Sequence, residues 1–322
     1  MKIKKYLPII GIAIFIYLLF KLDIASVFNE IKNANPSFIL MTVFFTFVSF
    51  FTSTIKWYAI ARKQNMNLPF FYAFKVNLIA IFYGFVTPSR IGSIARVEYL
   101  RRFNGDKVGK AVSNYVLDKM LDFCSLFILV IISGFLLKNI LPATHVKYAV
   151  AGLLAIFVFA LVFKEKERTR FFLKLFYIKI LPKKIKETVK EGFDSFYEDM
   201  PEKKYFVLFV FLNLLNWIAI YSTSFFAGLS IGLNVSFIYF LLFMPAVTLI
   251  GQIPITISGL GTREAAMISL FGLLGISTTK IFSMSLINLV INGIFPAIIG
   301  MLLILENKKN YGRKSQHSDA CP

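Results

Sequence analysis

The sequence is poor in the residues that most often carry out chemistry in proteins. Its 322 residues include two cysteines, Cys124 and Cys321, and two histidines, His145 and His317. Two cysteines exclude a disulfide framework and a cysteine-based metal site. Two histidines leave little for histidine-dependent acid–base catalysis. We therefore expect neither a metal ion nor a cofactor.

Charged residues are also scarce. They make up 16% of the chain, against 57% hydrophobic residues, and the mean hydropathy is +0.70. Soluble domains carry about 25% charged and about 45–50% apolar residues, so this balance is typical of a chain surrounded by lipid. Lys and Arg total 36 against 17 Asp and Glu, for a net charge of +19. Because the basic residues lie between apolar runs and not on one solvated face, nucleic acid is not an expected partner.

Long hydrophobic runs dominate what is present. About 20 mainly apolar residues are needed to cross about 30 Å of hydrocarbon. Six runs qualify as spans: residues 6–20, 38–61, 112–137, 147–163, 205–228 and 281–305. Two further apolar stretches, residues 70–102 and 237–277, are interrupted near their middles by Pro, Gly, Ser and Arg. We interpret each as a pair of half-helices, which makes the chain an all-α, polytopic transmembrane helix bundle.

The placement of basic residues predicts how the interrupted stretches lie, because Lys and Arg gather in cytoplasmic loops. Arg62 and Lys63 precede residues 70–102, and Arg101 and Arg102 close that stretch, so both of its ends are expected in the cytoplasm. Residues 229–236 carry no charge, so both ends of 237–277 are expected outside. The two stretches are then re-entrant hairpins of opposite orientation. The alternative is that both cross the membrane; either arrangement leaves both termini cytoplasmic in a multi-pass protein of the cell membrane.

The spans and interrupted stretches divide the chain into four segments. Residues 1–163 form a first membrane half, residues 205–305 a second, and residues 306–322 a cytoplasmic tail. Residues 164–204 link the halves and place apolar residues at helical spacing between Lys and Arg. This linker is expected to lie in the cytoplasm as amphipathic helices on the anionic membrane surface. A solvated linker that only follows the charge rule is the alternative.

The two interruptions resemble one another. Residues 89–93 read Ser-Arg-Ile-Gly-Ser and residues 258–262 read Ser-Gly-Leu-Gly-Thr, a shared serine, aliphatic, glycine and hydroxyl pattern. With opposite orientations they predict an inverted repeat, as in transporters that bind substrate near the membrane midplane. Broken helices present unpaired backbone N–H groups, to which an anion binds well. Alternatively, Ser89 and Ser258 are helix caps, and Gly92 and Gly261 only permit close packing.

Three arginines flank the interruptions: Arg90, Arg96 and Arg263. A lone arginine at mid-depth costs about 2.5–3.5 kcal/mol, so each needs a partner. Phosphate suits the planar guanidinium, which binds it in a bidentate manner. Glu98 and Glu264 are the nearest carboxylates in sequence, but residues so close on a helix are poorly aimed at one another. We expect the arginines to pair across segments or with a ligand.

A polar cluster interrupts the run at 112–137. Asp118 and Asp122 share one helix face, and Lys119 lies three residues before Asp122, so an ion pair is expected. The cluster either pairs with the arginines across the bundle or carries protons for coupled transport. Lys56 and Lys75 are expected to extend toward the inner interface. Six amides are expected to form interhelical hydrogen bonds: Asn77, Asn213, Asn216, Gln252, Asn288 and Asn292.

These motifs together resemble a known family. Residues 88–93, with Arg96, Leu100 and Arg101, resemble the first signature of the flippase-like membrane family typified by the transmembrane region of lysylphosphatidylglycerol synthase. Residues 259–264 are similar to its second signature, and the polar cluster at 118–122 is similar to the helix between them. The resemblance runs from about residue 5 to 305. Ser89 stands where the family usually has glycine and Ser93 where it usually has an acid, which makes the first interruption more positive here.

The resemblance implies binding and translocation of an anionic or charged lipid, a phospholipid or a polyprenyl-linked headgroup. The substrate-binding residues would be Ser89, Arg90, Gly92, Arg96, Ser258, Gly259, Gly261, Arg263 and Glu264, supported by Asp118, Lys119 and Asp122. Fuller members add a soluble aminoacyl-transferase domain, and with only residues 306–322 after the last span, that reaction is not expected here.

Two other functions remain open. One is a membrane transferase acting on polyprenyl phosphate, with Asp118 or Asp122 as base. The other is a non-catalytic partner of a separate lipid synthase. A homodimer is a further expected assembly. Against an enzyme, residues 164–204 contain no Asp-x-Asp pair and no glycine-rich phosphate loop.

Overall fold

The computed structural model describes residues 14–18, 20, 22–87, 90–101, 108–137, 194, 198, 200–202, 204–253, 256 and 258–318. Within these residues all regular structure is helical, as predicted. The elements in order are α2 (Ile24–Lys32), α3 (Pro36–Lys63), α4 (Phe70–Phe85), the 3-10 helix η2 (Ile91–Ala95), α5 (Arg96–Arg101), α6 (Val108–Leu136), α10 (Lys204–Ser230), α11 (Phe237–Gln252), α12 (Thr262–Gly272), α13 (Thr278–Leu289), the π-helix η3 (Val290–Ile294) and α14 (Phe295–Ser318).

Four helical stretches of the described chain are long and apolar enough to cross a membrane. They are α3, α6, α10 and the continuous stretch Thr278–Glu306, which joins α13, η3 and the first half of α14. They confirm the spans predicted at 38–61, 112–137, 205–228 and 281–305. The predicted span at 147–163 lies outside the described residues, and those at 6–20 and the linker at 164–204 lie largely outside them.

Local signals explain where α3 and α13 begin. The Asn35 side chain accepts a hydrogen bond from the Ser37 N–H at 2.9 Å, and Pro36 occupies the first helical turn, where its missing N–H costs nothing. Ser277 caps α13 through the Lys280 N–H. Side-chain caps satisfy N–H groups that a helix leaves free at its start.

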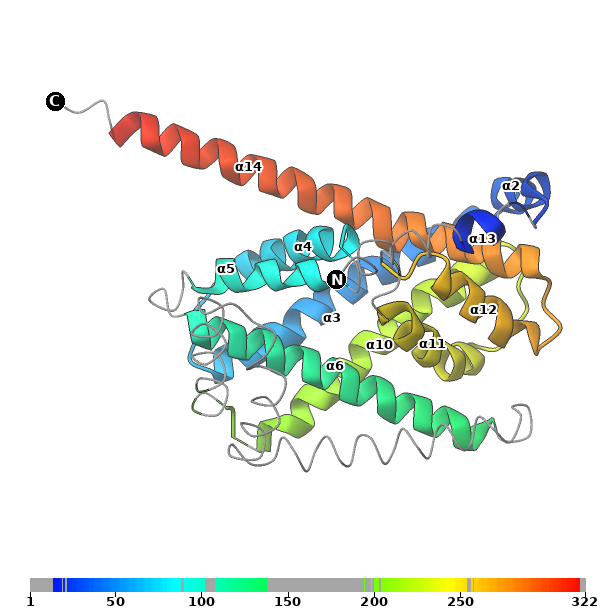
Figure 1. The fold of residues 1–322 in the computed structure, drawn as a ribbon, viewed down its shortest axis with the longest axis horizontal. Helices are drawn as coiled ribbons and strands as arrows, with labels where there is room; N and C mark the ends of the chain where they lie inside the picture. Colours follow the sequence, from blue (N-terminus) through cyan, green and yellow to red (C-terminus); the bar gives the residue numbers. More distant parts are fainter. Residues whose placement is uncertain are drawn as a thin grey trace, which may run out of the picture.

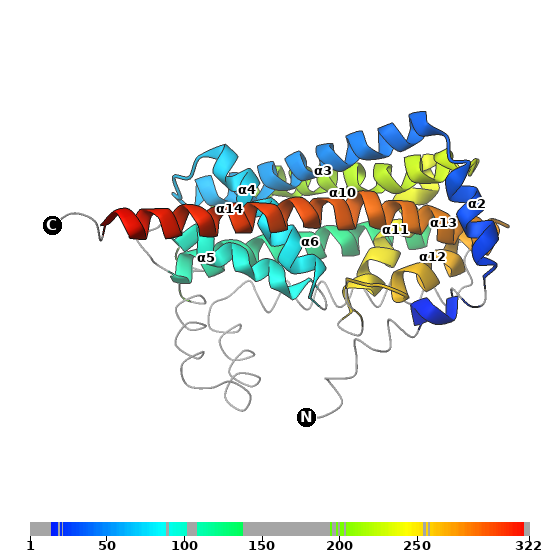
Figure 2. The ribbon, with the colours of Figure 1, turned by 90° about the horizontal axis from the view of Figure 1, so that it is seen from above.

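The helices form one bundle (Figures 1 and 2). α3 and α10 lie side by side along their lengths, and α14 packs on α4. In Figure 1, α14 runs along the upper side of the bundle and α6 along the lower side. Gly300 permits the contact between α14 and α4, because a Cβ at this position would lie 2.3 Å from the Leu78 carbonyl oxygen.

Both interrupted stretches consist of two helical pieces that contact each other. α4 and α11 have 16 residues each, too few to span about 30 Å of hydrocarbon at 1.5 Å per residue. After the first interruption, η2 and α5 pack against α4, and after the second, α12 packs against α11. In each stretch, the helical piece after the interruption therefore contacts the helix before it.

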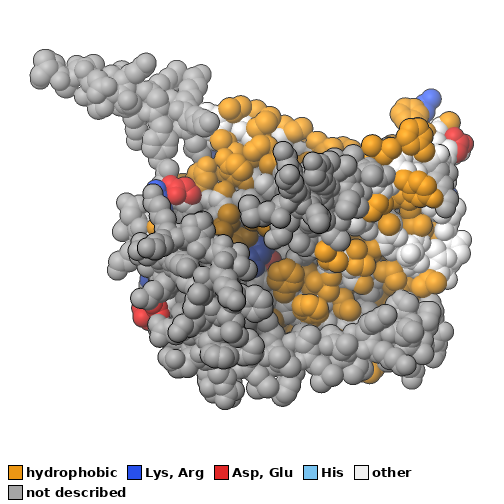
Figure 3. Space-filling model, in the orientation of Figure 1, with side chains coloured by type: hydrophobic (Ala, Val, Ile, Leu, Met, Phe, Trp, Pro, Cys, Tyr) orange, Lys and Arg blue, Asp and Glu red, His pale blue; other side chains and the backbone are white. Residues whose placement is uncertain are grey.

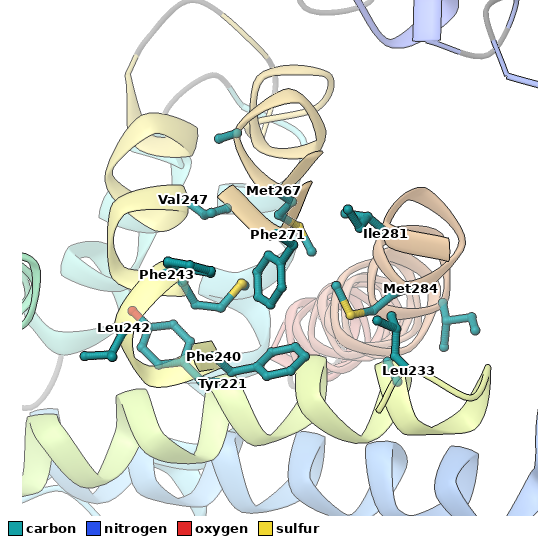
Figure 4. Packing of buried hydrophobic residues seen from close by; sticks show 14 of the residues in the cluster. Tyr221, Leu233, Phe240, Leu242, Phe243, Val247, Met267, Phe271, Ile281 and Met284 are labelled. Carbon is teal, nitrogen blue, oxygen red and sulfur yellow. The ribbon is translucent and has the colours of Figure 1, made fainter. Parts of the chain in front are cut away.

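Separate hydrophobic clusters hold these two stretches in place. The first gathers Trp57 of α3, Ala73 of α4, Leu100 of α5 and Ala111 of α6. The second lies between α10, α11, α12 and α13 (Figure 4). Phe271 of α12 packs there against two rings of α11, which belong to residues 240 and 243, with centroids 4.9 and 5.2 Å away in tilted and edge-to-face arrangements. Packing by large aromatic rings fixes the orientation of α12.

Candidate functional site

The first interruption is a tight turn between α4 and η2. Arg90 has a left-handed backbone conformation with φ of 56°. A Cβ on Gly92 would lie 2.1 Å from the Tyr83 carbonyl oxygen, so only glycine fits there. The Gly92 N–H donates to the Thr87 hydroxyl at 2.7 Å, so this backbone group is satisfied within the chain. Ser89, an expected site residue, lies outside the described residues.

The second interruption precedes α12 and is equally tight. Ser258, Gly259 and Gly261 have φ of 52°, 80° and 83°. A Cβ on Gly259 would lie 2.9 Å from the Gly251 carbonyl oxygen. The Gly261 N–H donates to the Glu264 carboxylate at 2.6 Å. Gly261, not Ser258, occupies the cap position of α12, so the alternative in which Ser258 caps the helix is wrong.

The two interruptions place their arginines in a similar way. A Cβ on Gly84 of α4 would lie 3.5 Å from the Cβ of Arg90, and one on Gly251 of α11 would lie 3.8 Å from that of Arg263. In Figures 1 and 2 the turn after α4 and the turn before α12 lie near each other, and Figure 2 shows both on the side of the bundle away from α3. The fold thus brings together two interruptions that are far apart in sequence.

Arg263 has a partner inside the bundle. One of its terminal nitrogens lies 3.3 Å from the Glu264 carboxylate and 3.1 Å from the Ser285 hydroxyl of α13. Ser285 also donates to Glu264 at 2.8 Å, and Glu264 is 1% exposed. The expectation that the adjacent Arg263 and Glu264 are too poorly aimed to meet was wrong. The carboxylate turns back toward the Gly261 N–H at the start of α12, where it stays within reach of the neighbouring guanidinium.

A buried ion network, here called the charge cluster, lies beside the interruptions. Asp118 contacts the Lys56 ammonium at 3.0 Å and an Arg96 terminal nitrogen at 2.7 Å. Asp122 also contacts Lys56 and lies 3.0 Å from the Lys119 ammonium. The predicted pair of Lys119 and Asp122 is confirmed. Of the three arginines considered as partners of this cluster, Arg96 is the one that forms an ion pair with it.

Lys56 is a member of the site that the sequence reasoning missed. Its side chain is 3% exposed and also donates to the Asn213 amide oxygen at 3.3 Å, so the expectation that it extends to the interface was wrong. The available signal was its spacing: Thr42, Ser49 and Lys56 recur every seven residues, and all three are buried on one face of α3. Lys75 is exposed on α4.

Arg96 is enclosed by aromatic rings as well as by Asp118. Its guanidinium lies 4.8 Å from the ring centroid of Trp57 and 5.5 Å from that of Tyr115. A cation over an aromatic face gains about 0.5–2 kcal/mol, most when desolvated. Because Arg96 is only 5% exposed, its charge lies in the interior of the bundle.

The five asparagines among the amides form the predicted hydrogen bonds between helices, and these tie the charge cluster to the rest of the bundle. Asn213 donates to the Leu121 carbonyl at 2.7 Å and to the Ser125 hydroxyl at 2.9 Å, linking α10 to α6. The others connect Asn77 with Thr54, Asn216 with Thr52, Asn288 with Ser224 and Asn292 with Thr223.

Three cations of the site are accessible. Arg90 is exposed, the Lys119 side chain is 39% exposed and the Arg263 side chain is 20% exposed. Among the residues that the structure describes, Arg90 has no carboxylate within ion-pair distance. Figure 3 shows a small patch of Lys or Arg side chains near the middle of the face drawn there, with hydrophobic side chains beside it.

The apolar helices and the buried charges define an integral, multi-pass membrane helix bundle. The family model described as lysylphosphatidylglycerol synthase TM region matches residues 8–300, and the chain belongs to that family. This confirms the resemblance drawn from the motifs.

Similar proteins share nearly the full length of the chain. A UPF0104 membrane protein of Pyrococcus horikoshii is 24% identical over 95% of this chain and 98% of its own length. One of Methanocaldococcus jannaschii is 23% identical over 98% of this chain and 99% of its own length. A third, from Methanothermobacter thermautotrophicus, is 23% identical over 84% of this chain and 86% of its own length.

Proposed function

We propose that the protein binds an anionic lipid headgroup between the two interruptions and translocates that lipid across the bilayer. The observation that carries this proposal is that Arg90 is exposed and has no carboxylate within ion-pair distance among the described residues, while the Arg263 side chain at the other interruption is 20% exposed. Like charges at membrane depth repel and are costly unless an anion lies between them. A phosphate group satisfies two guanidinium groups through charge-assisted hydrogen bonds.

The site binds through side chains more than through backbone N–H groups. Gly92 and Gly261, the glycines of the two turns, donate their N–H groups to Thr87 and Glu264. A headgroup would therefore meet the arginines first. Asp118 holds Arg96 in place, and Glu264 competes with a headgroup for Arg263.

We also propose that residues 70–102 and 237–277 are re-entrant hairpins in an inverted repeat, with both termini cytoplasmic. The contacts of α5 with α4 and of α12 with α11 support this arrangement, as do the matching arginine and glycine contacts. Single cysteines at Lys63 and Lys110 should then react with an impermeant thiol reagent from the same side of the membrane. Labelling from opposite sides would show that 70–102 crosses it.

The transferase alternative is less favoured by the geometry. Both oxygens of Asp118 contact cations, Lys56 and Arg96, and both oxygens of Asp122 contact Lys56 and Lys119. A general base must come within hydrogen-bond reach of the proton that it removes, whereas the Asp118 and Asp122 side chains are only 3% and 12% exposed. Carboxylates engaged in this way are better suited to hold cations in position.

Translocation can be measured in proteoliposomes with fluorescent phosphatidylglycerol and a fluorescent polyprenyl phosphate, using an impermeant quencher. Arg90→Ala should abolish protein-dependent transfer and Arg90→Lys should slow it, because lysine keeps the charge but loses the bidentate geometry. Lys75→Ala, which removes an exposed cation of α4 outside the site, is the matched control and should transfer at the wild-type rate. Transfer by Arg90→Ala at the wild-type rate for both lipids would refute the proposal.

A further inference from the structure

The charged side chains around the two interruptions do not balance. Five are basic and three are acidic: Lys56, Arg90, Arg96, Lys119 and Arg263 against Asp118, Asp122 and Glu264. The described part of the site therefore carries two positive charges in excess. We infer that its ligand is a lipid whose headgroup is a terminal phosphate monoester with two negative charges, and not a singly charged phosphodiester. This inference rests on the proposed function and narrows its substrate class.

The pairings show where the excess lies. Glu264 neutralises Arg263. Asp118 and Asp122 are shared among Lys56, Arg96 and Lys119, which leaves one of these three positive charges unmatched. Arg90, without a carboxylate partner among the described residues, supplies the second.

Lys119 is the cation of the charge cluster best placed to contact a ligand. Its side chain is 39% exposed, whereas those of Lys56 and Arg96 are 3% and 6% exposed. Asp122 keeps its contact with Lys56 if Lys119 turns away, so no buried carboxylate is left alone. Lys119 can thus release Asp122 and bind a phosphate oxygen without leaving the buried carboxylate unpaired.

A dianion fits this arrangement better than a monoanion. Opposite charges in contact attract strongly where little water screens them, so each unmatched cation adds to the attraction. A phosphate monoester carries about −1.5 to −2 charges at pH 7, because its second pKa is about 6. A phosphodiester carries one negative charge and leaves one cation of the site unmatched.

The surroundings favour a lipid as the source of this phosphate. Ile91 and Ile94 of η2, directly after Arg90, are 59% and 48% exposed. Ile250 and Ile253, just before the second interruption, are also exposed. An acyl or prenyl chain can cover such apolar surface, whereas free inorganic phosphate cannot.

The test uses the full-length protein in nanodiscs. The probes are phosphatidic acid and phosphatidylglycerol with identical acyl chains, a polyprenyl monophosphate, and inorganic phosphate as competitor. At pH 7.5 both monoesters should bind at least about tenfold more tightly than phosphatidylglycerol. At pH 5 this preference should shrink, because the monoester gains a proton while the diester keeps its single charge.

Variants of Lys119 make the test specific. Lys119→Gln should bring the affinity for phosphatidic acid close to that for phosphatidylglycerol, and Lys119→Arg should restore the preference. Lys75→Gln, outside the site, should leave both affinities unchanged.

Several outcomes would overturn the inference. Equal affinity of the wild-type protein for phosphatidic acid and phosphatidylglycerol at pH 7.5 would overturn it. If inorganic phosphate displaces the bound polyprenyl monophosphate at the same concentration as phosphatidic acid does, a lipid is excluded as the preferred source of the phosphate group. If phosphatidylglycerol binds as tightly as the monoesters and Arg90→Ala still abolishes binding, the proposed function stands and only the dianionic headgroup is excluded.

Discussion

Neutralising Asp118 tests whether the charge cluster is as strongly coupled as its burial indicates. The Asp118 side chain is 3% exposed and contacts Lys56 and Arg96 at 3.0 and 2.7 Å. In Asp118→Asn, Lys56 keeps Asp122, but Arg96 loses its carboxylate and remains buried. Breaking one partner of a buried ion pair costs about 3–5 kcal/mol, because the other charge is left uncompensated. We expect the free energy of unfolding to fall by that amount.

A matched control lies on α5, the short helix that carries Arg96. Arg101 pairs with Glu98 at 2.8 Å, with the same chemical groups, but these side chains are 39% and 50% exposed. Glu98→Gln should cost less than about 1 kcal/mol, because solvent screens an exposed pair. Unfolding is followed by far-ultraviolet circular dichroism as the mole fraction of dodecyl sulfate rises in mild-detergent micelles.

A double-mutant cycle isolates the pair. Adding Arg96→Met to Asp118→Asn removes the stranded cation, so the double variant should be less destabilised than the sum of the two single variants. Equal costs for Asp118→Asn and Glu98→Gln, or strictly additive effects in the cycle, would refute the assignment of Arg96 as the buried partner of Asp118.

Three further predictions follow from the packing and the caps. Gly92→Ala should lower the free energy of unfolding by about 1–3 kcal/mol in the same titration, because its Cβ would lie 2.1 Å from a carbonyl of α4. Gly272→Ala, with nothing within 4 Å, should not be destabilising. Asn213→Ala should cost about 1–3 kcal/mol, because a buried carbonyl of α6 loses its donor; full stability would mean that this bond contributes nothing. Glu264→Gln should keep an oxygen to cap α12 yet free Arg263, so nanodisc binding of phosphatidic acid should tighten; unchanged or weaker affinity would contradict this.

The sequence predicted the helical fold and four spans because burial in lipid acts on whole segments. A run of about 20 apolar residues crosses a bilayer whatever its neighbours are. The breaks at Gly92 and Gly261 were also visible, since glycine and proline punctuate helices without help from tertiary contacts. The pair of Lys119 with Asp122 needed only the geometry of one helix.

The wrong expectations share a physical cause. Lys56 was placed at the interface because one helix alone cannot show what packs against its polar face. Glu264 was judged unable to meet Arg263 on the assumption of regular helix geometry. That assumption fails at the first turn of α12, where the carboxylate accepts a hydrogen bond from the Gly261 N–H. Both errors concern contacts that a residue's own helix does not determine.

The sequence by itself determined which residues are costly in a membrane: arginines beside two breaks and two aspartates in an apolar helix. Only the tertiary structure decided how these charges are matched. Asp118 pairs with residues of α3 and α5, Arg263 contacts Ser285 of α13, and Arg90 is exposed without a carboxylate partner among the described residues. The physical reason is that hydropathy sets how deep a helix lies, whereas the rotation of that helix, set by side-chain packing with its neighbours, selects which charges come within 3–4 Å of each other.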